Sequence, residues 1–284
     1  MNNLIISIVF SFILWPVGTK QWTDKEFHEV HGPVKTIIIN SARYTSDSTG
    51  IKLGKRSIPD SISFSKKGNM TEHIYNKGKS KAIYFYNSSG KKSLVRVYDT
   101  YGHLCSWQVY SYDTYGFLIS RDTFSSNSTL EYSDKFQNNS SGNILISEFL
   151  NLRETEPFSK DIRKRKYDSH NNLVESESYD SLNLITKTLY RYDGLGRLEI
   201  QSGYRPDSTL SFLWIYSRDT YGNVIGKIEK DSKGEVQHMY KWEYLFDNRE
   251  NWIQKTEYQW EKSWKTSDYK PTRVTYRNIT YYPD

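Results

Sequence analysis

The chain has 284 residues, of which 36% are hydrophobic and 15% aromatic, and its formal net charge is +6. The shortage of aliphatic side chains excludes a thick Leu/Ile/Val core. The 24 Tyr and 8 Trp argue against disorder, because disordered chains are depleted in aromatic residues. The basic residues are scattered among Asp and Glu, and the densest run is only residues 163–166. We therefore do not expect a nucleic-acid partner.

The first twenty residues have the layout of a secretory signal. An apolar run covers residues 4–15 and is followed by Pro16, Val17, Gly18 and Thr19. The run is shorter than the roughly twenty apolar residues that a membrane-spanning helix needs. We predict a signal peptide at residues 1–19, export to the periplasm, the cell envelope or the exterior, and no transmembrane span beyond the signal. The alternative is a buried N-terminal strand or helix.

Cysteine and histidine usage does not indicate a metal site. Cys105 is the only cysteine, so no internal disulfide can form, and we expect a small buried side chain on a strand. None of the six histidines stands two or four residues from another. His28 and His31 are expected to be solvent-exposed. We predict no cofactor and no metal.

A first strand is predicted near residues 34–40. After it, a short motif recurs along the chain, and we call each copy a turn word. YDTYG occupies residues 98–102 and 112–116, YDGLG occupies 192–196, and DTYG occupies 219–222. The residues assigned to these turns are Asp99, Gly102, Asp113, Gly116, Asp193, Gly196, Asp219 and Gly222.

Each word has the chemistry of a tight turn. Asp or Asn at the first corner accepts a hydrogen bond from the backbone two residues on, and Gly at the fourth place accepts a positive φ. Looser copies put Asn171 and Asn183 in that place, and other turns are predicted at residues 125–128 and 205–208. The word therefore predicts a type I turn that closes a β-hairpin with a glycine bulge.

The segments between the words alternate with a period of two, which is typical of strands. Before Asp247, the aromatic side chains of Tyr240, Trp242, Tyr244 and Phe246 fall on one face. No comparable segment after the signal has helical periodicity. Residues 272–282 are expected to end the sheet or to cover one of its edges.

Two carboxylate pairs have a spacing that glycosidase acids could use. Glu154 with Glu156, and Glu175 with Glu177, would each share a face of a strand. Like charges two residues apart are common on exposed strands, and no catalytic motif accompanies either pair. We predict no catalytic residues and no enzymatic activity.

The C-terminal quarter is rich in aromatic side chains that could bind a ligand. On strand periodicity, Trp252, Tyr258 and Trp260 should share a face, opposite Lys255 and Glu257. Flat rings with polar neighbours suit the apolar faces of sugars, and the alternative is that the rings pack inside the sheet. The candidate ligand-binding residues are Trp242, Tyr244, Trp252, Tyr258, Trp260 and Trp264.

The word Tyr-Asp-x-x-Gly-x-Leu resembles the YD repeat of Rhs-type proteins over roughly residues 64–258. The segment FDNRENWIQKTEY resembles the closing part of small exported Bacteroidetes proteins with such repeats. The hairpins of MORN-like repeats have a related pattern of Tyr and Gly. Glu250 stands in the glycine place, so this turn should be strained or shifted onto Asn251. The resemblance implies β-repeat architecture in an extracellular or envelope setting, with carbohydrate or surface binding. The chain looks too short to close a shell.

These observations predict an all-β protein, an elongated antiparallel meander of hairpin repeats that is curled or stacked on itself. The expected divisions are a signal at residues 1–19, a lead-in strand and loop at 20–60, hairpin repeats at 61–260 and a C-terminal strand or cap at 261–284. The expected function is non-catalytic binding or scaffolding in the envelope, with a surface glycan as ligand. The alternative is a protein-interaction module whose partner is an envelope protein. The oligomeric state is left open.

Overall fold

The computed structural model describes residues 24, 28–48, 50–75, 78–153, 160–262 and 267–283. As the alternating sequence and the recurrent turns predict, almost all of this chain forms β-strands and turns. The described residues form nineteen strands joined mostly by short turns. The strands are β1 (Val34–Asp47), β2 (Gly50–Leu53), β3 (Asp60–Phe64), β4 (Met70–Tyr75), β5 (Ser80–Tyr86), β6 (Lys92–Asp99), β7 (Leu104–Tyr112), β8 (Leu118–Ser125), β9 (Leu130–Asn138), β10 (Ile144–Asn151), β11 (Lys160–Tyr167), β12 (Leu173–Asp180), β13 (Asn183–Tyr192), β14 (Leu198–Tyr204), β15 (Leu210–Arg218), β16 (Val224–Lys230), β17 (Val236–Phe246), β18 (Trp252–Lys262) and β19 (Ser267–Tyr281).

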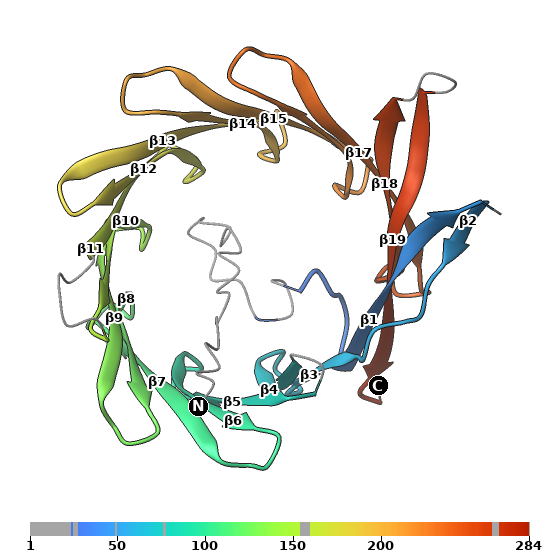
Figure 1. The fold of residues 1–284 in the computed structure, drawn as a ribbon. Coiled ribbons are helices and arrows are strands. Elements are labelled where there is room, and N and C mark those ends of the chain that lie inside the picture. Colours follow the sequence, from blue (N-terminus) through green and yellow to red (C-terminus); the bar gives the residue numbers. More distant parts are fainter. Residues whose placement is uncertain are drawn as a thin grey trace, which may run out of the picture.

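The sheet closes on itself. From β3 to β19, each strand pairs antiparallel with the next one along the chain, and β1 pairs with both β19 and β3. Since β2 pairs only with the far part of β1, the other 18 described strands form a closed barrel (Figure 1). The prediction of an all-β fold is confirmed, but the prediction of an elongated, open or stacked meander is wrong. Pairing of the first and last strands removes the two unpaired edges that an open sheet would expose.

The turns gather at two ends of the barrel, and the barrel widens from one end to the other (Figure 1). At the narrow end, the turns lie closer to the barrel axis. They cover residues 65–69, 87–91, 113–117, 139–143, 168–172, 193–197, 219–223 and 247–251. At the wide end, the hairpins splay outward. Their turns cover residues 99–103, 125–129, 180–183, 205–209 and 231–235.

The predicted turn chemistry is present in the words. Gly102, Gly116, Gly196 and Gly222 all have positive φ, between 73° and 93°. Each donates its backbone N–H to the carbonyl of the Asp three residues earlier. In the turn at residues 247–251, Glu250 stands in the glycine position and itself adopts the left-handed conformation, with φ 62°. This turn is therefore not shifted onto Asn251.

Three local expectations need correction or extension. Residues 179–183 form a two-residue turn in which Ser181, not Asn183, has positive φ, because Asp180 pairs with Asn183. The other turns predicted at 125–128 and 205–208 put serine in the glycine place. Cys105 lies on β7 as expected but is exposed rather than buried, because it points away from the barrel interior.

A ring of hydrogen bonds ties the narrow-end hairpins to one another. In seven of these bonds, a side chain near the end of one hairpin's first strand donates to a backbone carbonyl of the neighbouring strand, and in the eighth Tyr282, just after β19, donates to the last residue of β3. The distances run from 2.6 to 3.3 Å. The donors are Tyr86, Tyr112, Asn138, Tyr167, Tyr192, Arg218, Tyr244 and Tyr282. The acceptors are the oxygens of Met70, Lys92, Leu118, Ile144, Leu173, Leu198, Val224 and Phe64. The ring gives the Tyr of the turn word a structural role.

The main buried apolar cluster also lies toward the narrow end. In this cluster, Val30 of the lead-in segment packs with Val34 and Ile37 of β1 and with residues of β3 and β4. Ile37 is fully buried, and Ile62 and Phe64 are each 2% exposed. Within the described part of the chain, no helix has the length and apolar character needed to cross a bilayer. The predicted signal at residues 1–19 lies outside the described residues.

Candidate ligand-binding lumen

The lead-in segment, residues 28–33, identifies the inner face of the wall, because it runs inside the ring beside β1 (Figure 1). Glu29 of this segment accepts a hydrogen bond from Trp252 Nε1 at 3.3 Å. Trp252 packs edge-on against Tyr244, whose cross-strand partner is Lys255. Since cross-strand partners share a face and strand residues alternate, Tyr244, Trp242 and Tyr240 all face the lumen.

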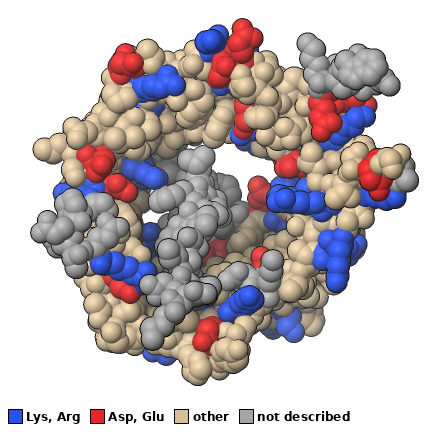
Figure 2. Space-filling view, in the orientation of Figure 1, with Lys and Arg blue, Asp and Glu red and all other residues tan. Residues whose placement is uncertain are grey.

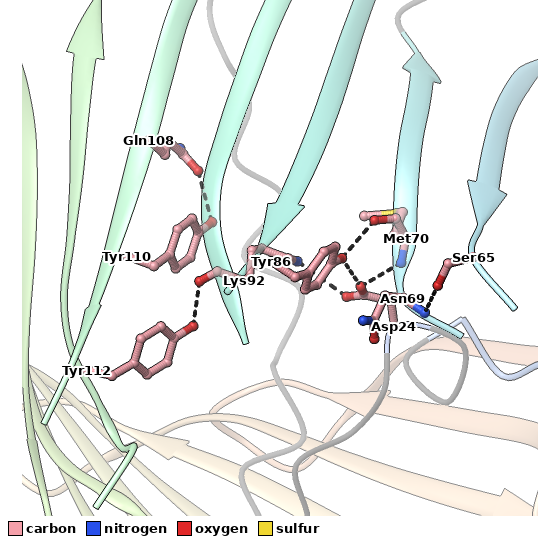
Figure 3. Close-up of polar contacts among 9 residues, drawn as sticks. All are labelled: Asp24, Ser65, Asn69, Met70, Tyr86, Lys92, Gln108, Tyr110 and Tyr112. Atoms are coloured by element: carbon pink, nitrogen blue, oxygen red, sulfur yellow. Dashed lines mark hydrogen bonds and ion pairs between the residues drawn. The ribbon is translucent and has the colours of Figure 1, made fainter. Parts of the chain in front are cut away.

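Asp24, which precedes the lead-in segment, also binds the inner wall. The Asp24 carboxylate accepts hydrogen bonds from Met70 N at 2.8 Å and from the hydroxyl of Tyr86, and it lies 3.3 Å from Lys92 Nζ. Figure 3 shows Asp24 between Met70 and Tyr86, beside the ring bonds made by Tyr86 and Tyr112. Burial raises the pKa of the Tyr112 hydroxyl to about 12, so this donor stays protonated.

Six side chains of β15 and β17 form an aromatic panel on this inner wall. The panel consists of Phe212, Trp214, Tyr216, His238, Tyr240 and Trp242. The register places these residues in continuous rows across the sheet. One row runs Tyr190, Gln201, Trp214, Glu229, His238, and the next runs Tyr216, Lys227, Tyr240, Gln259.

The rings of the panel lie close to one another and remain partly exposed. The ring centres of Phe212 and Trp214 are 4.6 Å apart, and those of Tyr240 and Trp242 are 5.9 Å apart in a stacked arrangement. Phe212 rests over Gly203, where an added Cβ would come within 2.1 Å of the ring. A glycine opposite the ring lets it lie flat against the wall, so its face stays available to the lumen.

Polar groups border the rings. Lys227 Nζ lies 3.8 Å from the centre of the Trp214 ring and 2.6 Å from Glu229 Oε1. Trp242 Nε1 donates to Glu257 Oε2 at 3.2 Å, while Gln201 Oε1 is buried and finds no hydrogen-bond partner in the part of the chain that the structure describes. Apolar ring faces beside carboxylates, amides and an ammonium are the combination that binds a sugar, which presents apolar C–H faces and hydroxyls.

The structure separates the candidate residues predicted from the sequence. Trp242, Tyr244 and Trp252 face the lumen, whereas Tyr258 and Trp260 face outward, where Trp260 meets Tyr269 edge-on. Trp264 lies outside the described residues. The expectation that Trp252 shares a face with Tyr258 and Trp260 is therefore wrong.

The cause is the bulge that follows the turn. The pairing of β17 with β18 shifts between Leu245 and Phe246, so Trp252 pairs with Phe246 while Gln254 pairs with Leu245. The extra residue, Ile253, reverses the alternation. A bulge of the same kind follows the other turn words. Alternation therefore predicts the face of a side chain only for residues that come after the bulge.

The sequence reasoning missed the β15 half of the panel. Phe212, Trp214 and Tyr216 alternate in LSFLWIYSR at the same period of two that identified Tyr240, Trp242 and Tyr244. That signal was present in the sequence. What links the two halves is the register through Lys227 and Glu229 of β16, which no single segment reveals.

Cations gather where the panel approaches the narrow end. Lys255 of β18 pairs with Thr275 of β19, so Arg273 and Arg277 lie on the same face, two residues to either side. We call Lys255, Arg273 and Arg277 the cationic seat. Arg277 stacks on Trp252, with its guanidinium carbon 3.4 Å from the ring centre. Burial lowers the pKa of Lys255 and lowers that of Arg277 to about 10, and the Glu29 carboxylate opposes both shifts.

The carboxylates weighed as catalytic acids lie elsewhere. Glu175 is on the outer wall between Lys166 at 2.6 Å and Lys187 at 2.7 Å, and hydrogen bonds from these lysines lower its pKa. A general acid needs a raised pKa, so the geometry makes Glu175 an ion-pair partner. Glu154 and Glu156 lie outside the described residues. The described residues contain no group of three or more His, Cys, Asp or Glu suited to a metal ion.

The two histidines near the N-terminus differ in their surroundings. His31 is exposed, as expected, and its backbone N–H donates to Asn251 Oδ1 at 2.6 Å. His28 is half-buried against the edge of Phe64, and burial lowers its pKa to about 4. The prediction of exposure is therefore wrong for His28, because the lead-in segment carries it into the barrel.

Comparison with known proteins gives a likeness of fold alone. A porin-like protein from Bacteroides uniformis matches with 8% identity and a TM-score of 0.47, over 86% of this chain and 96% of that one. A porin-like protein from Bacteroides vulgatus matches with 10% identity and a TM-score of 0.28, over 88% of this chain and 98% of that one. The TcdB2-TccC3-Cdc42 structure matches with 12% identity and a TM-score of 0.37, over 84% of this chain and 14% of that one.

No family model and no curated protein matches the sequence. The YD-repeat resemblance therefore remains a resemblance of the turn words and their hairpins. The function has to be argued from the lumen itself.

Proposed function

We propose that this chain is an exported, non-catalytic binding protein of the cell envelope or exterior whose lumen takes a glycan. The observation that carries the proposal is the aromatic panel, six rings on the inner wall bordered by Lys227, Glu229, Glu257 and Gln201. Rings held in rows by a closed sheet are pre-organised, so a sugar chain binds without the cost of ordering them. Figure 2 shows a gap through the middle of the ring of described residues.

The outer wall supports a setting in water. Ion pairs join neighbouring outer side chains, including Lys160 with Glu148 at 3.1 Å and Lys241 with Glu243 at 2.7 Å. Glu175 bridges Lys166 and Lys187 on the same side. Together with the apolar run at residues 4–15, this favours export into an aqueous compartment.

A glycan array followed by titration calorimetry tests the proposal. Trp242→Ala and Trp214→Ala should each weaken binding at least about tenfold, because a buried aromatic contact commonly contributes 2 kcal/mol or more. Trp260→Ala removes a ring of the same type from the outer wall and should leave the affinity unchanged. Circular dichroism checks that all three variants fold.

Two results would overturn this proposal. If no glycan binds the wild-type chain, the panel is structural, and a search for a polypeptide partner takes its place. If Trp260→Ala weakens binding as much as Trp242→Ala, the ligand does not occupy the lumen.

A further inference from the structure

The aromatic panel does not end at Trp242. Along β17, Tyr244 follows on the same inner face, and its ring lies edge-on to Trp252, with centres 6.3 Å apart. Trp252 is only 5% exposed, and its ring supports the cationic seat, with Arg277 at 3.4 Å and Lys255 Nζ at 5.2 Å. A ligand lying along β17 toward the narrow end would therefore pass from sugar-binding rings to three positive charges.

Within the described part of the chain, the charges of the seat are not fully matched. The Nε and Nη1 atoms of Arg277 are buried and have no hydrogen-bond partner among the described residues. Buried guanidinium donors are normally paired, because leaving them unpaired costs the desolvation of a charge. Glu257 is near Lys255 but already accepts hydrogen bonds from Trp242 Nε1 and Thr272 Oγ1. Figure 2 shows Lys or Arg side chains bordering the central opening on the side of β18 and β19.

One carboxylate of the lead-in segment already occupies this region. Glu29 is exposed, accepts the Trp252 N–H at 3.3 Å, and lies near enough to Lys255 and Arg277 to act on both electrostatically. Its backbone has φ 53°, a left-handed conformation that is unfavourable for a non-glycine residue. The segment thus places the Glu29 carboxylate on Trp252, beside the seat, in an unfavourable backbone conformation, and leaves Nε and Nη1 of Arg277 without a partner among the described residues.

We propose that the cationic seat binds a carboxylate of the ligand, and that Glu29 is an intramolecular occupant that competes with it. Resting on the proposed function, this inference names the ligand subclass: an acidic glycan, with a uronate residue at Lys255, Arg273 and Arg277 and neighbouring sugars along Tyr244, Trp242 and Tyr240. Charge-assisted hydrogen bonds from arginine to carboxylate supply the selectivity over neutral sugars.

The test compares two probes that differ only at C6, an α-1,4-linked galacturonate trimer and the matching neutral galactose trimer. Calorimetry on the wild-type chain should show roughly tenfold tighter binding of the acidic trimer, as expected for charge-assisted hydrogen bonds. Glu29→Gln should tighten the acidic trimer further, several-fold, and leave the neutral trimer unchanged. Glu235→Gln, an exposed carboxylate in a wide-end turn, is the matched control and should change neither affinity.

Arg277→Gln should abolish the preference for the acidic trimer while the dependence on Trp242 persists. Since Arg277 is partly buried, Arg273→Gln, which removes an exposed charge of the same seat, gives an independent reading if Arg277→Gln does not fold. Equal affinity for both trimers in the wild-type chain, with binding lost in Trp242→Ala, would leave the proposed function standing and sink this inference. Failure to bind the acidic trimer while the array finds neutral ligands would do the same. No binding on the array would instead end the proposed function itself.

Discussion

Two factors favour glycine in the narrow-end turns, the positive φ and the close packing of neighbouring turns. Comparing Gly142 with Gly90 distinguishes the two factors. Gly142 and Gly90 both have positive φ, 80° and 75°. A Cβ on Gly142 would lie 2.4 Å from Phe117 Cε1 of the preceding turn, whereas a Cβ on Gly90 would meet open space. Conformation alone explains Gly90, while close packing between neighbouring turns adds to the requirement at Gly142.

Gly142→Ala is therefore expected to lower the free energy of unfolding more than Gly90→Ala. Each substitution costs about 1–2 kcal/mol for a left-handed alanine. Gly142→Ala should cost about 1–3 kcal/mol more, because the Phe117 ring must move. Urea unfolding of both variants followed by tryptophan fluorescence measures the difference, and equal losses would show that Phe117 relaxes freely.

At the scale of elements, the same turn motif has different structural roles at the two ends of the barrel. YDTYGHL at residues 98–104 forms a wide-end turn, and Tyr98 points to the outer wall near Lys81. YDTYGFL at residues 112–118 forms a narrow-end turn, and Tyr112 points inward to bond Lys92 O at 2.7 Å. The two copies lie one strand apart, so they mark opposite ends of β7. Only the inward copy joins the ring.

Tyr192→Phe tests the ring of hydrogen bonds. The Tyr192 hydroxyl donates to Leu173 O at 2.8 Å, and burial raises its pKa to about 12. Removing the hydroxyl leaves a carbonyl beside a buried side chain unpaired and should cost about 1–2 kcal/mol of unfolding free energy. Tyr221→Phe, at a turn residue that is 84% exposed, should cost almost nothing. Similar unfolding midpoints for the two variants would mean that water replaces the bond.

At the scale of the whole molecule, closure depends on β1, which carries partners on both sides. Val34 to Arg43 pair with β19, and Thr36 to Ile39 pair with β3. The hydroxyls of Thr36 and Thr280 are 2.5 Å apart across the β1–β19 seam. This seam joins residues more than two hundred positions apart, so it forms only when the ring of hairpins is complete.

A cysteine pair across the seam tests closure directly. In a Cys105→Ser background, Thr36→Cys with Thr280→Cys should oxidise to an intramolecular disulfide, because directly opposed strand positions bring the Cβ atoms within bridging range. Thr36→Cys with Lys164→Cys places the second thiol on β11, across the barrel, and should stay reduced. Gel mobility without reductant reads both variants. A seam pair that stays reduced would indicate an open sheet.

The sequence by itself determined the turns, the strands and the antiparallel neighbours, because a turn such as Asp113 to Gly116 is set by local backbone chemistry. It also indicated the alternation of Tyr240, Trp242 and Tyr244, since no bulge interrupts β17 there. It failed for Trp252, where the bulge at Ile253 reverses the faces, and for Cys105, whose face depends on the direction in which the sheet curves.

Only the tertiary structure decided that the meander closes. Closure follows from the twist and stagger summed over 18 strands and from the match between β1 and β19, and neither quantity can be read from any one hairpin. The closed wall then decided what the aromatic residues can do. It turned Trp214, Tyr240 and Trp242 toward one lumen, turned Tyr258 and Trp260 outward, and brought Glu29 into hydrogen-bond contact with Trp252, although these two residues lie at opposite ends of the chain.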